Sequence, residues 1–385
     1  IYCLFINVRH QYCYIKLLSS LRPKILLYLP RIKGSNLFTQ ISRTMNEQKY
    51  KIVTCASFGN TGSGIVTDYL LEFPSIHNPG DYEFRFLQDY GGVSTLEDAL
   101  LHNQHRMNTD IAIRDFIHYI EYQSGDLLAK HYEKFFKGAF KKISYEFINK
   151  LIDVEWPGYW EHHQIIAPKT KRLFMYKLYP RIRRLLGGNR KYIARYLPKS
   201  PMYFSNPEPE YFYQCVKEYM ESLCESLDPQ HKFDFIYFDQ LLPPTNVNRY
   251  FNYFNNLKVV IVDRDPRDHY IDNYFYWREG WIPLDLDKYI ALYRGIRKKL
   301  LSEQENPNVL RIKFEDAIYH YDEFAEQINA FLDLKKENHL FPKRNFDPAI
   351  SIKNTCLWKR YPVPQSVLEK IERELPEFCY SFERS

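Results

Sequence analysis

Apolar and polar residues recur with the periods of strands and helices along the chain after Met45. Residues 51–55 form a strand-like run, and a small-residue loop at 56–64 separates it from an amphipathic stretch that begins at Ile65. A strand, a glycine-containing loop and a helix, in this order, open a parallel-sheet fold. Apolar and polar residues alternate at 82–86, which predicts a second strand.

The remaining pattern predicts helices in the middle of the chain and strands toward its end. Helical spacing of apolar residues covers 95–155 and 211–227. Residues 156–210 are basic and contain prolines, and we expect them to be irregular, as an insertion or as a lid over a site. Further strands are expected at residues 233–238, 257–262 and 309–314. Further helices are expected from about His269 and over residues 321–332.

The clearest predicted strand is residues 257–262, a continuous apolar run. Such a run is typical of a strand that is buried on both faces, in a sheet with helices on both sides. We therefore predict an α/β fold, a three-layer αβα arrangement with a central parallel sheet. We expect one domain over residues 45–385, with a helical and irregular insertion at about 95–230.

Residues 1–44 are kept apart from this domain. The chain begins with Ile1, and Met45 is its first methionine. Basic residues interrupt the apolar ones, so that no run approaches the roughly 20 apolar residues of a membrane helix, and we expect no stable membrane span. The segment is interpreted either as a leader that is not part of the native protein or as an anchor at a membrane surface.

The composition is that of a globular protein, with 45% hydrophobic and 26% charged residues among 385. The net charge of +6 suits an anionic nucleotide and an anionic acceptor, and no nucleic-acid-binding motif accompanies it. The strongest basic run lies between Lys169 and Arg195, and it is interpreted as a solvated helix face or as a rim that attracts acidic substrates. The aromatic content of 17% fits either a sugar-stacking surface or a general compositional bias.

The 7 cysteines lie far apart, with no C-x-x-C pair and an odd total. This pattern argues against a zinc site and against a disulfide framework, and it favours a reducing compartment. No cluster with metal-ligand spacing stands out, so we expect a cytoplasmic protein without a metal site.

The loop after the first strand is the most informative stretch for function. It reads Gly59-Asn60-Thr61-Gly62-Ser63-Gly64. Three glycines allow a tight turn whose N–H groups point inward, Thr61 and Ser63 add hydroxyl donors, and the N-terminus of the next helix lies nearby. These groups suit a phosphate or a sulfate. The lysine that ends the loop of nucleotide triphosphatases is absent, which argues against a kinase.

Together these features resemble the sulfotransferases that use 3′-phosphoadenosine 5′-phosphosulfate (PAPS), on a fold related to P-loop nucleotide kinases. The resemblance covers roughly residues 50–360. Residues 60–64 resemble the family's 5′-phosphosulfate loop, with Asn60 in place of its usual lysine. Residues 262–268 resemble the Arg-Asp/Asn-Pro-Arg-Asp segment that follows the family's buried strand. Residues 310–316 and 331–334 resemble its later strand-Glu-Asp and Phe-Leu patterns.

By this resemblance Arg264 would bind the 3′-phosphate, because the guanidinium fork fits phosphate oxygens. The alternative for Arg264 is an ion pair with one of the neighbouring carboxylates, Asp263, Asp265 or Asp268.

Two further positions of the nucleotide site follow from the same resemblance. The family has a serine eight residues after its arginine, where this chain has Asp272, and Asn273 is the candidate to replace that serine. Residues 351–359 resemble the late loop that closes over the nucleotide. In that loop Lys353 and Lys359 are candidate phosphate contacts, or else solvated lysines.

For the general base that removes the acceptor's proton, the resemblance favours Glu83. Residues 83–86 resemble the Glu-x-x-Phe segment of glycan sulfotransferases, and burial among Tyr82, Phe84 and Phe86 is expected to suit Glu83 to proton transfer at neutral pH. The alternative is that Glu83 pairs with Arg85 or another cation.

His163 is the second candidate base, because family members that act on small molecules use histidine. It lies beside Trp160 and His162, and this aromatic stretch is equally a candidate wall that stacks sugars. Arg85 is a further candidate for contact with the acceptor.

The resemblance thus implies an enzyme that transfers a sulfuryl group from PAPS to a hydroxyl or amine acceptor on a glycan, without a metal and without nucleic acid as a partner. Two alternatives stay open. One is a P-loop-like phosphotransferase, and the other is a catalytically inactive protein that binds a nucleotide or a glycan.

Overall fold

The computed structural model of the protein describes residues 50–125, 131–186 and 196–382. The leader predicted at residues 1–44 lies outside the described residues. So do three basic residues of the predicted run, Arg190, Lys191 and Arg195.

Within these residues, five parallel strands form the central sheet. In chain order they are β1 (Ile52–Ser57), β2 (Ile76–His77), β5 (Phe235–Asp239), β6 (Leu257–Asp263) and β7 (Val309–Lys313). Their spatial order is β2-β5-β1-β6-β7, so that β1 lies between β5 and β6. The predicted strands at 51–55, 233–238, 257–262 and 309–314 are confirmed, and with them the parallel α/β sheet.

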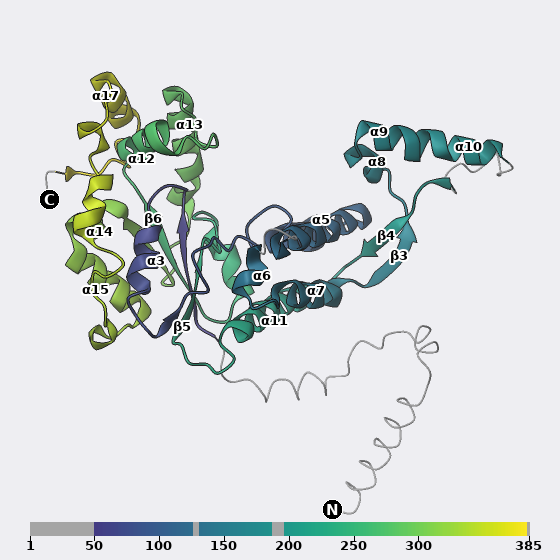
Figure 1. Ribbon diagram of the computed structural model, residues 1–385, viewed down its shortest axis with the longest axis horizontal. Coiled ribbons are helices and arrows are strands. Elements are labelled where there is room, and N and C mark those ends of the chain that lie inside the picture. The colour runs from purple at the N-terminus through teal and green to yellow at the C-terminus, as the bar shows by residue number, and fades with distance from the viewer. Residues whose placement is uncertain (1–49, 126–130, 187–195, 383–385) are drawn as a thin grey trace, which may run out of the picture. The chain divides into compact units, whose positions relative to one another are not determined.

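Successive residues of each strand face opposite sides of the sheet, and both sides are buried. In β1, Ile52 and Ala56 belong to one apolar cluster, whereas Val53 and Cys55 belong to another. This alternation explains why the strands read as continuous apolar runs. Helices pack on both faces (Figure 1), which gives the three layers that the sequence predicts.

Two sets of helices supply these outer layers. Those whose buried residues join the cluster of Ile52 are α4 (Val93–Glu97), the π-helix η2 (Asp98–His102), α5 (Arg106–Ser124), α6 (His131–Phe135), α7 (Phe140–Leu151), α11 (Pro209–Leu227) and the 3-10 helix η5 (Val247–Tyr253). Those that join the cluster of Val53 are α3 (Gly64–Leu70), α14 (Phe314–Tyr319) and α15 (Tyr321–Leu332).

A third, smaller cluster packs beside the carboxyl end of β6. Its helices are α12 (Pro266–Asp272), α13 (Leu286–Arg297), the 3-10 helix η10 (Leu357–Lys359) and α17 (Gln365–Glu374). Further short elements along the chain are the π-helix η6 (Asn273–Trp277), the helix α16 (Pro348–Ser351) and the 3-10 helices η7 (Lys298–Ser302), η8 (Lys336–Asn338) and η9 (Ile352–Asn354).

The prediction of a strand at residues 82–86 is wrong. Only one isolated bridge joins Glu83 to Asp239, and the second strand of the sheet is β2 instead. Hydrogen bonds from the N–H groups of Gln88 and Asp89 to the carbonyl of Arg85 turn the chain at once. The alternation at 82–86 arises because the two phenylalanines are buried in the core while their neighbours face outward.

The prediction that residues 156–210 are irregular is also wrong in part. An antiparallel pair, β3 (Val154–Gly158) and β4 (Ser200–Phe204), brackets it. Beyond this pair lie the helices α8 (His162–Ile166), α9 (Lys169–Lys171), η3 (Arg172–Leu178) and α10 (Tyr179–Leu185) (Figure 1). Prolines do not exclude this pairing, since Pro157 and Pro201 oppose each other in an isolated two-stranded ladder.

Candidate functional site

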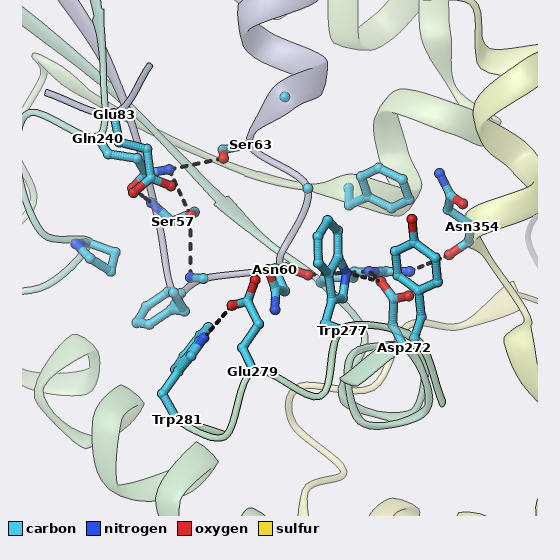
Figure 2. A pocket seen from close by; sticks show the side chains of 18 of the residues that line it. Ser57, Asn60, Ser63, Glu83, Gln240, Asp272, Trp277, Glu279, Trp281 and Asn354 are labelled. Atoms are coloured by element: carbon cyan, nitrogen blue, oxygen red, sulfur yellow. Dashed lines mark hydrogen bonds and ion pairs between the residues drawn. The ribbon is translucent and has the colours of Figure 1, made fainter. Parts of the chain in front are cut away.

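One cavity of about 1340 Å³ opens at the carboxyl ends of the central strands (Figure 2). The loop after β1 lines it, as do Gln240 after β5, Arg264 after β6 and Phe314 after β7. Open parallel sheets bind ligands at this edge, because loops from several strands converge there. The glycine loop and Arg264, predicted as two parts of one site, therefore share a cleft.

The loop takes a conformation that requires glycine at two positions. Gly59 and Gly62 have φ values of +79° and +87°, a region that side chains disfavour. A Cβ atom at Gly59 would overlap the ring of Trp281, and one at Gly62 would overlap the ring of Phe314. Asn60 between them is also left-handed, with φ of +52°, which asparagine tolerates better than most residues.

Gln240 fastens the two ends of the loop. Its Oε1 accepts from the N–H of Ser57 at 3.2 Å, and its Nε2 lies 2.9 Å from the Ser57 hydroxyl and 3.0 Å from the Ser63 hydroxyl (Figure 2). Because the Ser63 oxygen accepts from Gln240, its own proton is free to be donated into the cavity that Ser63 lines.

The prediction that Thr61 offers a hydroxyl to the ligand needs correction. The Thr61 side chain is fully buried and donates to the carbonyl of Val262 at 2.8 Å, at the end of β6. Its hydroxyl therefore ties the loop to the neighbouring strand. Any contact from Thr61 to a ligand must come from its backbone.

A second set of contacts positions the tip of the loop. Asn60 donates from Nδ2 to Oδ1 of Asn273 at 2.9 Å, and Asn273 in turn donates to the carbonyl of His269. His269 lies 3.0 Å from the carbonyl of Gly59, and burial followed by the charge of Arg297 lowers the pKa of His269 to about 3. The neutral imidazole thus donates to the loop. Asn273 is 2% exposed and supports the loop from behind, rather than lining the cavity.

Arg264 is buried at the other end of the cleft, with its side chain 4% exposed. Its Nη1 lies 2.7 Å from Oδ2 of Asp272 and donates to the carbonyl of Asn60, and its Nη2 donates to the carbonyl of Asn354. The guanidinium stacks on the ring of Phe314 at 5.1 Å. Buried Nε of Arg264 has no hydrogen-bond partner among the described residues, which leaves one donor unmatched.

The carboxylates that neighbour Arg264 in sequence pair with other arginines. Asp263 binds Arg297 at 2.6 Å, and Asp265 binds Arg267 at 2.6 Å. The ion pair of Arg264 is instead with Asp272, eight residues on. Asp272 is itself part of the cavity wall, so the pair lies within the candidate site.

The late loop forms the wall next to Arg264. Asp268 accepts from the N–H groups of Cys356 and Leu357 at 2.9 and 2.6 Å and so fastens this loop to α12. Burial raises the pKa of Asp268 to about 6. Of the two predicted lysines, Lys353 lines the cavity and Lys359 does not.

The opposite wall carries the predicted base. Glu83 and Arg85 both line the cavity, with Nη1 of Arg85 3.6 Å from the Glu83 carboxylate. The expected burial of Glu83 among aromatic rings is wrong, because its side chain is 57% exposed and only the phenylalanines on either side of Arg85 point into the core. Behind Glu83, burial and then the charge of Glu83 raise the pKa of Asp239 to about 7.

The structure does not bring the second candidate base into this cavity. Trp160, His162 and His163 lie beyond the β3–β4 pair, where the guanidinium of Arg106 covers the Trp160 ring at 4.1 Å. Burial, followed by the charge of Arg114, lowers the pKa of His163. These three residues belong to the outlying segment rather than to the wall around the glycine loop.

Several cavity residues escape prediction from the sequence. Tyr276, Trp277 and Trp281 supply an aromatic rim, and Arg360 adds a second cation, besides Lys353, to the late-loop part of the lining. The rim has a signal in the sequence, since aromatic residues cluster directly after the Arg264 segment. Gln240 has none, because a single glutamine after a strand is unremarkable until the sheet order places it beside the loop.

None of the helices in the described part of the chain is both long and apolar enough to span a bilayer. Nor do three or more His, Cys, Asp or Glu side chains of the described chain gather in a group that could hold a metal ion.

Comparison with known proteins returns similar structures only. No protein-family model and no curated sequence matches the chain. The sulfotransferase domain of the Synechococcus PCC 7002 olefin synthase aligns with 12% identity and a TM-score of 0.40, over 88% of this chain and 98% of that domain. The sulfotransferase domain of the curacin biosynthetic pathway aligns with 14% identity and a TM-score of 0.38, over 85% of this chain and 98% of that domain.

A retinol dehydratase solved with androsterone and the inactive cofactor PAP aligns with 13% identity and a TM-score of 0.29, over 84% of this chain and 79% of that protein. The fold of this chain is defined by its own strand order and by the two helical layers on its sheet.

Proposed function

We propose that the protein transfers a sulfuryl group from PAPS to a hydroxyl or amine acceptor. The observation that carries this proposal is the shared cavity, in which the glycine loop and the buried guanidinium of Arg264 lie at the ends of two adjacent strands. An adenine nucleotide with phosphate groups at both its 3′ and 5′ positions presents two anionic centres to such a cleft.

The residues present fit this donor in three respects. The loop from Gly59 to Gly64 offers backbone N–H groups and the Ser63 hydroxyl to a phosphosulfate. Arg264, with its unmatched Nε, Lys353 and Arg360 supply cations at the other side. The aromatic rim offers faces on which an adenine or a sugar ring can stack.

When bound, PAPS supplies an activated sulfuryl group and an adenosine 3′,5′-bisphosphate leaving group. The loop holds the sulfuryl group in line with the attacking atom of the acceptor, which lowers the entropic barrier to transfer. Glu83, on the facing wall, takes the proton that the acceptor oxygen or nitrogen loses. Arg85, paired to Glu83, holds this carboxylate toward the cavity. A glycan acceptor is the finer part of the proposal, supported by the open, aromatic mouth of the cleft.

Calorimetry tests the nucleotide specificity directly. Titration with adenosine 3′,5′-bisphosphate is expected to show binding, whereas ATP with magnesium binds weakly or not at all, because the loop lacks the lysine of triphosphate sites. Arg264→Ala is expected to weaken the binding of adenosine 3′,5′-bisphosphate by about 2–3 kcal/mol, the contribution of a hydrogen bond to a charged group.

Arg311→Ala is the matched control, since Arg311 is a 42% exposed arginine outside the cavity. Thermal melts of both variants verify that the fold is retained. Tighter binding of ATP with magnesium would favour the phosphotransferase alternative, and unchanged affinity in Arg264→Ala would remove Arg264 from the site.

A further inference from the structure

An exposed amphipathic helix stands apart from the three buried clusters of the fold. Helices α9, η3 and α10 run without a break over residues 169–185, here called the arm helix (Figure 1). Large apolar side chains along it are open to solvent: Leu173 and Phe174 are each 58% exposed, and Leu185 is 73% exposed. The exposed set on and beside the arm helix is Ile165, Ile166, Leu173, Phe174, Met175, Leu178, Tyr179, Ile182, Leu185 and Leu186.

These side chains are too many and too close together for the ordinary surface of a soluble domain. Isolated exposed apolar residues are common, but contiguous apolar patches on a monomer mark a place where something else binds. Phe174, Leu178 and Ile182 follow each other at intervals of four residues, and Leu185 comes three residues later. The spacing is that of a helix with one apolar face.

The charge of the arm helix has one sign only. Its cations are Lys169, Lys171, Arg172, Lys177, Arg181, Arg183 and Arg184. No aspartate or glutamate occurs anywhere between Glu161 and Glu208. The cations of this helix therefore have no carboxylate within their own segment to neutralise them.

We infer that the arm helix binds the surface of an anionic lipid bilayer. Apolar side chains of a surface helix insert at the boundary between head groups and acyl chains, while lysine and arginine reach up to the phosphates. Each cation near an anionic leaflet adds attraction of its own. An anionic bilayer interacts with both kinds of side chain on the arm helix, the exposed apolar residues and the cations that its own segment does not neutralise. The inference is independent of the chemistry in the cavity.

Two other partners of the arm helix would each match only one of its two properties, the apolar residues or the cations. A second copy of the chain, packed arm against arm, would place like charges opposite each other with no carboxylate of the arm to pair with them. A soluble polyanion such as a nucleic acid would bind the cations and leave leucine, isoleucine and phenylalanine in water. A bilayer with anionic lipid satisfies both requirements.

Co-sedimentation of the full chain with vesicles tests this inference. Binding is expected to vesicles of phosphatidylcholine with phosphatidylserine, to be much weaker with phosphatidylcholine alone, and to fall as salt is raised. Arg181→Gln with Arg183→Gln is expected to weaken partitioning about 25-fold, from about fivefold per cation. The triple variant Phe174→Ser, Leu178→Ser, Leu185→Ser is expected to bind these vesicles at least about tenfold more weakly than the parent chain, at low salt and at high salt alike.

Matched controls come from exposed residues elsewhere. Leu340→Ser changes a leucine that is 58% exposed, and Lys142→Gln changes a lysine that is 79% exposed. Both should bind vesicles as the parent chain does. Because the altered arm residues are exposed, all variants should keep the melting temperature of the parent.

Three results would overturn the inference. The parent chain fails to bind anionic vesicles. The apolar triple variant binds them as well as the parent, while both bind polyuridylic acid equally, which indicates a polyanion site. Or the parent forms dimers that the triple variant abolishes, without any binding to vesicles, which indicates that the arm pairs with a second copy.

Discussion

Asp272 and Arg264 neutralise each other within the wall of the cavity. Their 2.7 Å ion pair involves a guanidinium that is 4% exposed and a carboxylate that is 21% exposed, so solvent screens it only in part. A phosphate group brought to Arg264 would therefore meet the negative charge of Asp272 at close range. In the proposed function this pair would reduce the affinity of the site for a 3′-phosphate. The chain has Asp272 where the pattern that it resembles has a serine.

Replacing this carboxylate should strengthen the proposed nucleotide site. Asp272→Ser is expected to raise the affinity for adenosine 3′,5′-bisphosphate at least about tenfold, because one like charge is removed and a hydroxyl donor is gained. Calorimetry measures the change, with Glu279→Gln as a control that removes another carboxylate from the same cavity wall. A weaker or unchanged affinity in Asp272→Ser would mean that the phosphate does not approach Arg264.

The proposed role of Glu83 as the general base can be tested separately from nucleotide binding. Glu83→Gln keeps the size of the side chain and one acceptor oxygen, but its amide cannot take up a proton at neutral pH. It is expected to leave the affinity for adenosine 3′,5′-bisphosphate unchanged and to lower turnover at least about 100-fold, the usual contribution of a general base. Release of the bisphosphate from PAPS in the presence of acceptor gives the rate. Turnover close to that of the parent chain would assign proton removal to another group.

Some residues of the site are predictable from the sequence alone, and others are not. The glycines at 59 and 62 can be read from the sequence because their backbone angles and the rings against them exclude side chains. Gln240 and Arg360 cannot, because they reach the cavity only through sheet order and the path of the late loop. The hydroxyl of Thr61 shows the converse error, since a donor in a phosphate-type loop can be used inside the protein.

Buried acids connect the elements around the cavity. Glu315, at the start of α14, is fully buried and accepts from the N–H of Asp265, the residue that caps α12, at 2.9 Å. Burial, followed by the charge of Asp265, raises the pKa of Glu315 to about 8. Its carboxyl group thus stays protonated in the folded chain at neutral pH, although it ionises near pH 4 in the unfolded chain.

This difference makes stability depend on pH. Between about pH 4 and 8 the folded chain holds a proton that the unfolded chain has lost, so the free energy of unfolding falls as pH rises, by up to about 1.4 kcal/mol per pH unit for this group. Glu315→Gln keeps the acceptor for Asp265 and removes the titration. Urea unfolding between pH 5 and 8 should therefore show a flatter dependence in this variant.

The exposed Glu146→Gln provides the control, since its carboxylate is 61% exposed and should leave the slope unchanged. Asp239 and Asp268, whose pKa values are also raised, keep their own contributions to the slope in every variant. Equal slopes in Glu315→Gln and in the parent chain would show that Glu315 is ionised when folded.

Elements are predicted well where burial is two-sided and poorly where it is not. The strands β1, β5, β6 and β7 and the helix α15 agree with the pattern of apolar residues, because the core dictates their periodicity, whereas the two-residue strand β2 does not stand out in that pattern. The turn at residues 82–86 mimics a strand, since two buried phenylalanines alternate with exposed neighbours. The β3–β4 pair is missed because it packs little apolar surface, and the partner strands are separated by the outlying helices.

Across the whole molecule, a mild net charge of +6 conceals an uneven distribution. Four cations line the cavity, Arg85, Arg264, Lys353 and Arg360, and seven lie on the arm helix, whose segment lacks acidic residues. In the cavity three carboxylates accompany them, Glu83, Asp272 and Glu279. Total charge alone therefore indicates neither site, whereas the position of each charge on the fold separates a mixed binding pocket from a purely basic surface.

The ring of Phe314 touches both halves of the cleft, since it lies against Gly62 of the loop and beneath the guanidinium of Arg264. The ring is 4% exposed, so close packing in the core holds it in place and fixes the spacing between the glycine loop and the guanidinium. A ligand that contacts both groups must match this spacing as well as the charge that each group presents.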